Sequence, residues 1–214
     1  MNPEMRRVAF AQPVPRRLAG PIIALIALAV FALGALAQAP QNVRIRGTIT
    51  AIDGNTVALK SRDGTDMKLM LNDKTTVATA RPITLAELKG DVPVGVTAVK
   101  GPDGVLVARE VHTIPKTATL GHSEWDLEPG ASMTNALIES NVKVANGQEL
   151  VMTYSGGTQR IRVPPGTPIV TTIPADRGAL APGVYVFVTA QVMPDNTIIA
   201  LRIQASKDGV KPPQ

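Results

Sequence analysis

The stretch Val94-Gly95-Val96-Thr97-Ala98 returns 92 residues later as Val186-Phe187-Val188-Thr189-Ala190. Extending the comparison outward aligns residues 75–111 with residues 167–203 without a gap, and about a third of the aligned pairs are identical. Internal similarity at a fixed spacing is the sequence mark of a duplicated structural unit. The sequence therefore predicts two copies of one small module.

Apolar and polar residues alternate along most of each copy, and turn-forming residues separate the alternating runs. The first copy opens with a hairpin signature, in which Val43 to Ile52 and Thr56 to Ser61 flank Asp53-Gly54-Asn55. Its last hairpin turns across Gly101-Pro102-Asp103-Gly104, and Thr84-Leu85-Ala86-Glu87 before it has capping-box spacing. We expect an all-β protein with two tandem small β-barrels, OB-like or SH3-like, each of five or six strands with one short helical turn. A sandwich is the alternative.

The predicted modules occupy residues 42–113 and 132–205. Residues 114–131 between them contain proline and glycine and show no sustained periodicity, which is typical of a linker. Residues 206–214 are polar and rich in proline. We expect this last segment to be a flexible tail.

Residues 1–37 have the pattern of a secretory signal peptide. Arg16 and Arg17 precede an uncharged apolar stretch at 18–37, and Ala35-Leu36-Ala37 has the small-x-small form of a cleavage site. We expect an N-terminal signal helix that is cut after Ala37, which places the protein in the periplasm. The alternative is an uncut helix at 18–37 that anchors the chain in the inner membrane.

The charge of the chain lies largely in this leader. The whole sequence carries a net charge of +5, but the leader contains four arginines and one glutamate, so its removal leaves +2. The mature part keeps one basic cluster on its early strands, which has no aromatic residue among it and suits a solvated strand face. The cluster consists of Arg44, Arg46, Lys60, Arg62 and Lys68. We therefore expect no nucleic-acid partner, and the absence of cysteine excludes disulfides and thiolate metal sites.

Three elements of the first copy form a recognisable pattern: Gly47 to Ile52, Leu88-Lys89-Gly90-Asp91, and the closing run from Asp103 to Val111. In the second copy, Pro182-Gly183 replaces the Gly-Asp pair and Asn196 replaces the closing glycine. Each copy resembles the exported bacterial modules grouped as domain of unknown function 5666. The resemblance implies the fold of those modules and assigns no activity to any residue.

The linker holds the one unusual cluster of side chains, His122-Ser123-Glu124-Trp125-Asp126. Alternate residues of an extended segment share a face, so His122, Glu124 and Asp126, joined by His112, are candidate ligands for copper or zinc. The competing interpretation is a polar linker in which Trp125 covers the gap between the modules and contacts a ligand or partner.

No catalytic motif accompanies this cluster, and the sequence predicts neither catalytic residues nor a cofactor. The leading hypothesis is an exported periplasmic binding or accessory protein without catalytic activity, whose partner is an envelope protein or a small ligand. One alternative is weak handling of divalent copper or zinc through the linker. A second is a hydrolase with an unrecognised carboxylate site. Membrane contact is expected only through an uncut leader.

Overall fold

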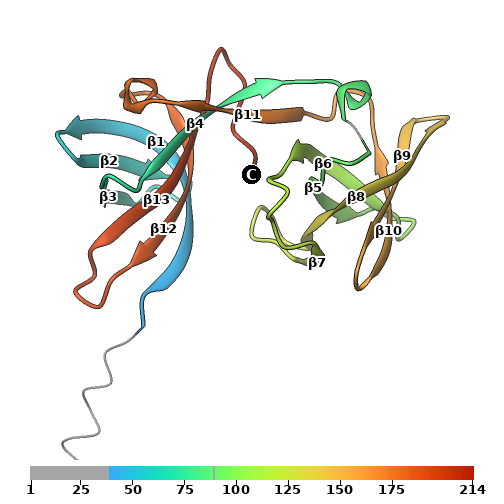
Figure 1. Cartoon of the computed structure of the whole chain (residues 1–214), viewed down its shortest axis with the longest axis horizontal. Helices are drawn as coiled ribbons and strands as arrows, with labels where there is room; N and C mark the ends of the chain where they lie inside the picture. Colours follow the sequence, from blue (N-terminus) through green and yellow to red (C-terminus); the bar gives the residue numbers. More distant parts are fainter. Residues whose placement is uncertain (1–38, 89) are drawn as a thin grey trace, which may run out of the picture. The chain divides into compact units, whose positions relative to one another are not determined.

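Strands make up most of the described chain (Figure 1). The computed structural model describes residues 39–88 and 90–214, so the expected signal at 1–37 and the alternative anchor at 18–37 lie outside the described residues. Within that part of the chain, no helix has both the length and the apolar character needed to cross a membrane. The elements are β1 (Gln41–Asp53), β2 (Thr56–Ser61), β3 (Asp66–Met70), β4 (Thr76–Pro82), η1 (Leu85–Glu87), β5 (Val94–Lys100), β6 (Leu106–Thr113), β7 (Gly121–Glu124), β8 (Ala131–Val144), β9 (Gly147–Tyr154), β10 (Gly157–Val163), β11 (Ile169–Ala175), η2 (Arg177–Ala179), β12 (Tyr185–Val192) and β13 (Ile198–Ala205).

Local sequence explains these elements, and the prediction of an all-β protein is confirmed. In β2, the buried side chains of Val57 and Leu59 alternate with more exposed neighbours, as expected for a strand with one face in a core. Gly54 supplies the positive φ of 53° at the turn between β1 and β2. The single helical turn expected after Thr84 is the 3₁₀ turn η1, where the Thr84 backbone N–H donates to the Glu87 carboxylate at 2.7 Å.

Strand pairing forms two closed circuits. The first runs from β1 through β2, β3, β13 and β12 back to β1. The second runs from β8 through β9, β10, β6 and β5 back to β8. In each circuit the closing contact is a parallel pair, Met70 with Ile199 in the first and Ile161 with Leu106 in the second. Closure leaves few unpaired backbone groups at the edges.

The circuits do not follow the order of the sequence repeats, which corrects the expected module boundaries. Hairpin β5–β6 of the first repeat completes the circuit of β8, β9 and β10, while hairpin β12–β13 of the second repeat lies beside β1, β2 and β3 (Figure 1). Residues 42–113 and 132–205 therefore do not enclose separate cores. The two hairpins present nearly the same alternation of apolar residues.

An antiparallel ribbon of β4 and β11 carries the chain between the circuits. Ala80 pairs with Thr172 at its centre. Pro82 and Pro174 lie in these two strands, and each favours an extended conformation for the residue before it. The extended backbone leads the chain away from one circuit and toward the other. The pairings on either side are related by the spacing of 92 residues: Val77 pairs with Ile203, and Ile169 with Val111.

Two hydrophobic clusters fill the circuits, and each draws on both repeats. The first contains Ile49 and Leu59 together with Val188 and Ile203. The second contains Val94, Val96 and Val111 with Leu150, Met152 and Ile161. Full burial of such side chains contributes about 1.5–3 kcal/mol each. Aliphatic residues therefore supply almost all of the packing inside the circuits. Most of the few aromatic residues lie outside these clusters.

The two segments expected to lack regular structure also differ from expectation. The linker at 114–131 contains β7, which pairs with β8. The tail at 206–214 carries an isolated bridge between Lys207 and Val210, and Pro212 and Pro213 beyond it are buried. Both segments carry side chains of the candidate site.

Candidate ligand-contact site around Trp125

Trp125 follows β7 directly and begins a tight loop that returns to β8. Its backbone N–H donates to the carbonyl oxygen of Ala131 at 2.9 Å, and the N–H of Ala131 donates to Glu128 at 3.0 Å. The Glu128 carboxylate accepts from Arg109 Nε at 2.6 Å. These bonds fix the backbone of the loop that carries Trp125.

The guanidinium of Arg44 covers the Trp125 ring at 4.2 Å from its centroid, and that of Arg46 lies at 6.0 Å. Arg46 also lies 4.7 Å from the centroid of the Phe187 ring. A cation held against aromatic faces is attracted by about 0.5–2 kcal/mol, with the larger values at desolvated sites. Alternate residues of β1 thus bring two cations to the aromatic side chains of two distant segments.

Arg46 is only 4% exposed, so its charge needs a partner. Asp126 provides it: its Oδ1 lies 3.0 Å from Arg46 Nη2, and its Oδ2 lies 3.4 Å from Arg44 Nε. Partial burial acts to raise the pKa of Asp126, but the hydrogen bond and charge of Arg46, with the charge of Arg44, hold the pKa below its ordinary value. Asp126 is therefore an anion at neutral pH.

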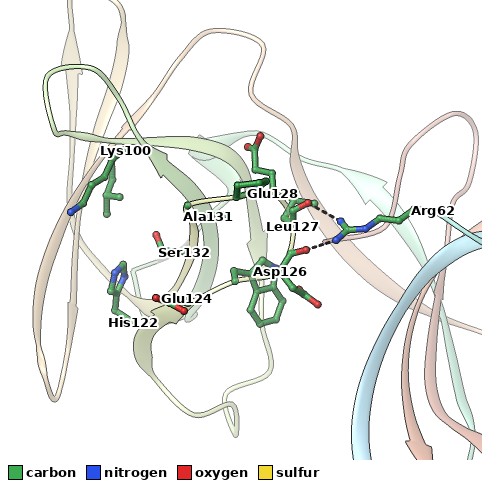
Figure 2. Close-up of a pocket in the computed structure, with 13 residues that line it drawn as sticks. Arg62, Lys100, His122, Glu124, Asp126, Leu127, Glu128, Ala131 and Ser132 are labelled. Carbon is green, nitrogen blue, oxygen red and sulfur yellow. Dashed lines mark hydrogen bonds between the residues drawn. The ribbon is translucent and has the colours of Figure 1, made fainter.

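Arg62, in the turn after β2, fixes the same loop through its backbone. Its two terminal nitrogens donate to the carbonyl oxygens of Asp126 and of Leu127, the latter at 2.7 Å (Figure 2). Three members of the basic cluster, Arg44, Arg46 and Arg62, thus bind the linker loop. The expectation of a solvated strand face is wrong for Arg46, which is buried, while Arg44 and Arg62 are exposed to solvent and bind the loop as well. We call Trp125, Asp126, Arg44, Arg46 and Arg62 the Trp125 site.

An open pocket of about 780 Å³ borders the loop. Figure 2 shows Lys100, His122 and Ser132 on one side of it and Arg62 on the other. His122 Nδ1 shares a hydrogen bond of 2.8 Å with the Thr134 hydroxyl, which orients its ring.

The expected metal ligands have other contacts. His112 is buried on β6, where its Nδ1 lies 2.9 Å from the carboxylate of the buried Glu110. Asp126 is bound to arginine, His122 to Thr134, and Glu124 is exposed. Among residues 39–88 and 90–214, no three histidine or carboxylate side chains gather closely enough to hold a metal ion.

The buried tail contributes to the same region, which the sequence did not indicate. Trp125 Nε1 donates to the main-chain oxygen of Gln214 at 3.0 Å, and the Thr97 hydroxyl donates to that oxygen at 3.3 Å. The Gln214 N–H donates to the Glu110 carboxylate at 3.1 Å, and the Tyr185 hydroxyl donates to Gln214 Oε1 at the same distance. A pocket of about 170 Å³ remains beside Pro213 and Gln214. We call Thr97, Glu110, Trp125, Tyr185 and Phe187, which surround this segment, the tail groove.

One sequence signal could have indicated these residues. Only four aromatic residues follow residue 38, and three of them, Trp125, Tyr185 and Phe187, lie in the tail groove. Burial raises the pKa of Tyr185, against the opposing charges of Arg46 and Arg62, so its hydroxyl stays a donor at neutral pH. Scarce aromatics concentrated in one place are typical of contact sites.

The resolved shifts of carboxyl pKa in the described residues are all downward. Such groups are anions at neutral pH, which suits ion pairing and turn formation and not proton donation. They are Asp63, Glu87, Asp103, Asp126 and Asp195. Of these groups, Asp126 belongs to the Trp125 site, where it pairs with Arg44 and Arg46.

Comparison with known proteins adds no family to this description. No protein-family model, no curated protein and no solved structure matches the chain.

Proposed function

We propose that the protein is an exported, non-catalytic binding or accessory protein of the bacterial envelope, which holds a partner protein or small ligand at the Trp125 site. One observation carries the proposal: the chain's single tryptophan is fixed in a tight loop between Arg44 and a bound peptide segment. Tryptophan, tyrosine and arginine are the residues that most often dominate binding energy at protein interfaces. The buried members of both core clusters are aliphatic, apart from Met152, and Tyr154 packs against the second cluster.

For the architecture, we propose a tandem duplication of an OB-like barrel whose two copies exchange their closing hairpins. The circuits support this proposal, because each joins five strands and closes through a parallel pair. Equivalent irregularities lie 92 residues apart, at Thr97/Ala98 and Thr189/Ala190. Exchange of identical elements between copies is a known route to assembly.

The proposed location is the periplasm, after cleavage behind Ala37. Support comes from the arginines at 16 and 17, the apolar stretch at 18–37 and the resemblance to exported modules. Residues Ala39–Gln214 form a compact unit of their own, so cleavage at this point leaves every described element intact.

The proposal is tested by capture from envelope extracts with immobilised residues 39–214. We expect a ligand or protein that is retained by the unaltered chain and lost with Trp125→Ala. Val142→Ala is the control, because it trims an exposed apolar side chain at the end of β8. Identical retention by the Trp125→Ala chain, or turnover of a substrate panel with nothing retained, would overturn the proposal.

A further inference from the structure

We infer that the tail groove is a recognition site for extended, proline-containing polypeptide segments, and that Lys211-Pro212-Pro213-Gln214 occupies it as a tethered competitor of an external segment. The inference rests on the proposed binding role of the Trp125 site and names the class of its partner. The bound tail itself shows which chemistry the groove accepts.

The groove has the features of a proline-peptide site. Proline-rich segments adopt an extended helix before binding and dock into grooves lined by aromatic side chains, so little conformational entropy is lost. Here Pro212 and Pro213 are both buried. Pro213 lies in a pocket that Trp125 and Phe187 also line, and the Lys211 ammonium lies 5.3 Å from the centroid of the Tyr185 ring.

Buried polar groups of the groove bind the backbone of the occupant. Glu110 is 6% exposed and Thr97 is fully buried, and they contact the N–H and the main-chain oxygen of Gln214. A buried carboxylate and a buried hydroxyl need hydrogen-bond partners. Because these partners are backbone groups, any extended segment with an N–H at this position can supply them.

One contact of the groove is made to the side chain of the bound segment, at Gln214. The Tyr185 hydroxyl donates to Gln214 Oε1 at 3.1 Å, and Gln214 Nε2 donates to the carbonyl oxygen of Pro212 at 2.7 Å. The groove therefore distinguishes glutamine from a side chain without an acceptor at this position.

Comparison of the two repeats shows which residues of β12 have the same character in both copies and which differ. Val92, Val94 and Val96 correspond to Val184, Val186 and Val188, so the apolar positions of the strand are the same in both copies. Between them, the first copy has Pro93 and Gly95 where the second has Tyr185 and Phe187. A Cβ at Gly95 would clash with His112 Nε2, so β5 has no room for a side chain there. On β12 there is room for one, and Tyr185 and Phe187 both lie in the tail groove.

The tail can leave the groove without breaking a strand. β13 ends at Ala205, and a turn with positive φ at Asp208 and Gly209 joins it to the buried residues. A tethered segment competes at an effective concentration on the order of millimolar. An external segment therefore binds weakly to the unaltered chain and more tightly when the tail is displaced.

The test uses residues 39–214 with Pro212→Gly and Pro213→Gly together, which keeps the length of the tail. A synthetic peptide with the sequence of residues 210–214 is titrated while the fluorescence of Trp125, the only tryptophan, is followed. We expect saturable binding that is at least about tenfold tighter than to the unaltered chain, since the competitor has been removed. A control peptide with alanine in place of both prolines should show no binding.

Specificity and folding are checked separately. We call the chain with Pro212→Gly and Pro213→Gly the release variant. Adding Tyr185→Phe to it should weaken its affinity for the glutamine-containing peptide several-fold. Its affinity for a peptide with alanine at that position should not change. If the release variant fails to fold, the unaltered chain is titrated with several millimolar peptide, and the Gln214 amide resonance should move to its random-coil position. A folded release variant that binds neither peptide, equal binding of both peptides, or an unmoved Gln214 resonance would overturn the inference.

These outcomes distinguish the two proposals. Retention of an envelope ligand that depends on Trp125, without peptide binding, would overturn the proline-segment inference and support the proposed function. Peptide binding without any envelope ligand would support the groove and overturn the proposed function.

Discussion

Trp125 Nε1 donates a hydrogen bond to the main-chain oxygen of Gln214 across 89 residues of chain. The bond joins the loop after β7 to the tail after β13, and the same indole ring lies against Arg44. The loop, the tail and β1 therefore meet at the Trp125 side chain. A substitution of Trp125 should alter the contacts of all three segments.

Trp125→Phe keeps an aromatic face under Arg44 and removes the indole donor. We expect a loss of about 1 kcal/mol in the free energy of unfolding, the typical net value of one hydrogen bond. Trp125→Ala also removes the cation–π contact and buried area, and we expect a loss of about 2–4 kcal/mol. Urea denaturation followed by circular dichroism measures both. Equal losses for the two variants would contradict the stacking of Arg44 on the ring.

Asp126→Asn should destabilise the protein more than its exposed position suggests, because it leaves the buried Arg46 guanidinium without its anion. We expect a loss of about 1–2 kcal/mol after allowing for solvent screening of the half-exposed carboxylate. In a chain that already carries Arg46→Met, the same substitution should have little effect. A double-mutant cycle measures the coupling, and additive losses would show that the pair contributes nothing.

Stability should fall in acid through the same group. The folded-state pKa of Asp126 lies below its ordinary value, so the stabilisation is fully present above the unfolded pKa of about 4 and is lost as pH falls through the lower folded value. Denaturation curves between about pH 2 and pH 7 should show this loss, and Asp126→Asn should make it smaller. The account fails here if the variant has the same acid profile as the unaltered chain.

The exchanged hairpins predict the behaviour of half the chain. Residues 39–113 contain β1, β2 and β3, but the structure pairs these strands with β12 and β13. Two copies of the fragment can supply one another with β5–β6, so we expect a dimer by light scattering coupled to gel filtration. A folded monomer would show that the ribbon of β4 does not prevent folding back.

Strands and turns could be predicted from the sequence because they depend on neighbours. The alternation from Val43 to Ile52 became β1, and the turn at Gly101-Pro102-Asp103-Gly104 has positive φ at Gly104. In the second copy Asn196 takes the place of that glycine with φ 64°, which asparagine tolerates better than most residues.

The hairpin exchange could not be predicted, because β5–β6 and β12–β13 carry nearly the same pattern of apolar residues, and that pattern does not say which circuit each hairpin joins. The site was only partly predicted. Trp125 was identified as a contact residue of the linker, but its contacts with Arg44 and Gln214 join residues that are more than 80 positions apart. Alternation along the linker suggested a metal site at His122, Glu124 and Asp126. In the structure, the Asp126 carboxylate instead forms ion pairs with Arg44 and Arg46 of β1. Local spacing carries no information about such partners.

The most direct test of the central claim, that Trp125 lies in a groove filled by the tail and open to a partner, is hydrogen exchange at the indole N–H of Trp125. As the chain has one tryptophan, this group gives a single resonance. We predict slow exchange in the unaltered chain, fast exchange in the Pro212→Gly and Pro213→Gly variant, and slow exchange again when the peptide of residues 210–214 is added. An indole that exchanges at the same rate in all three samples would contradict the account.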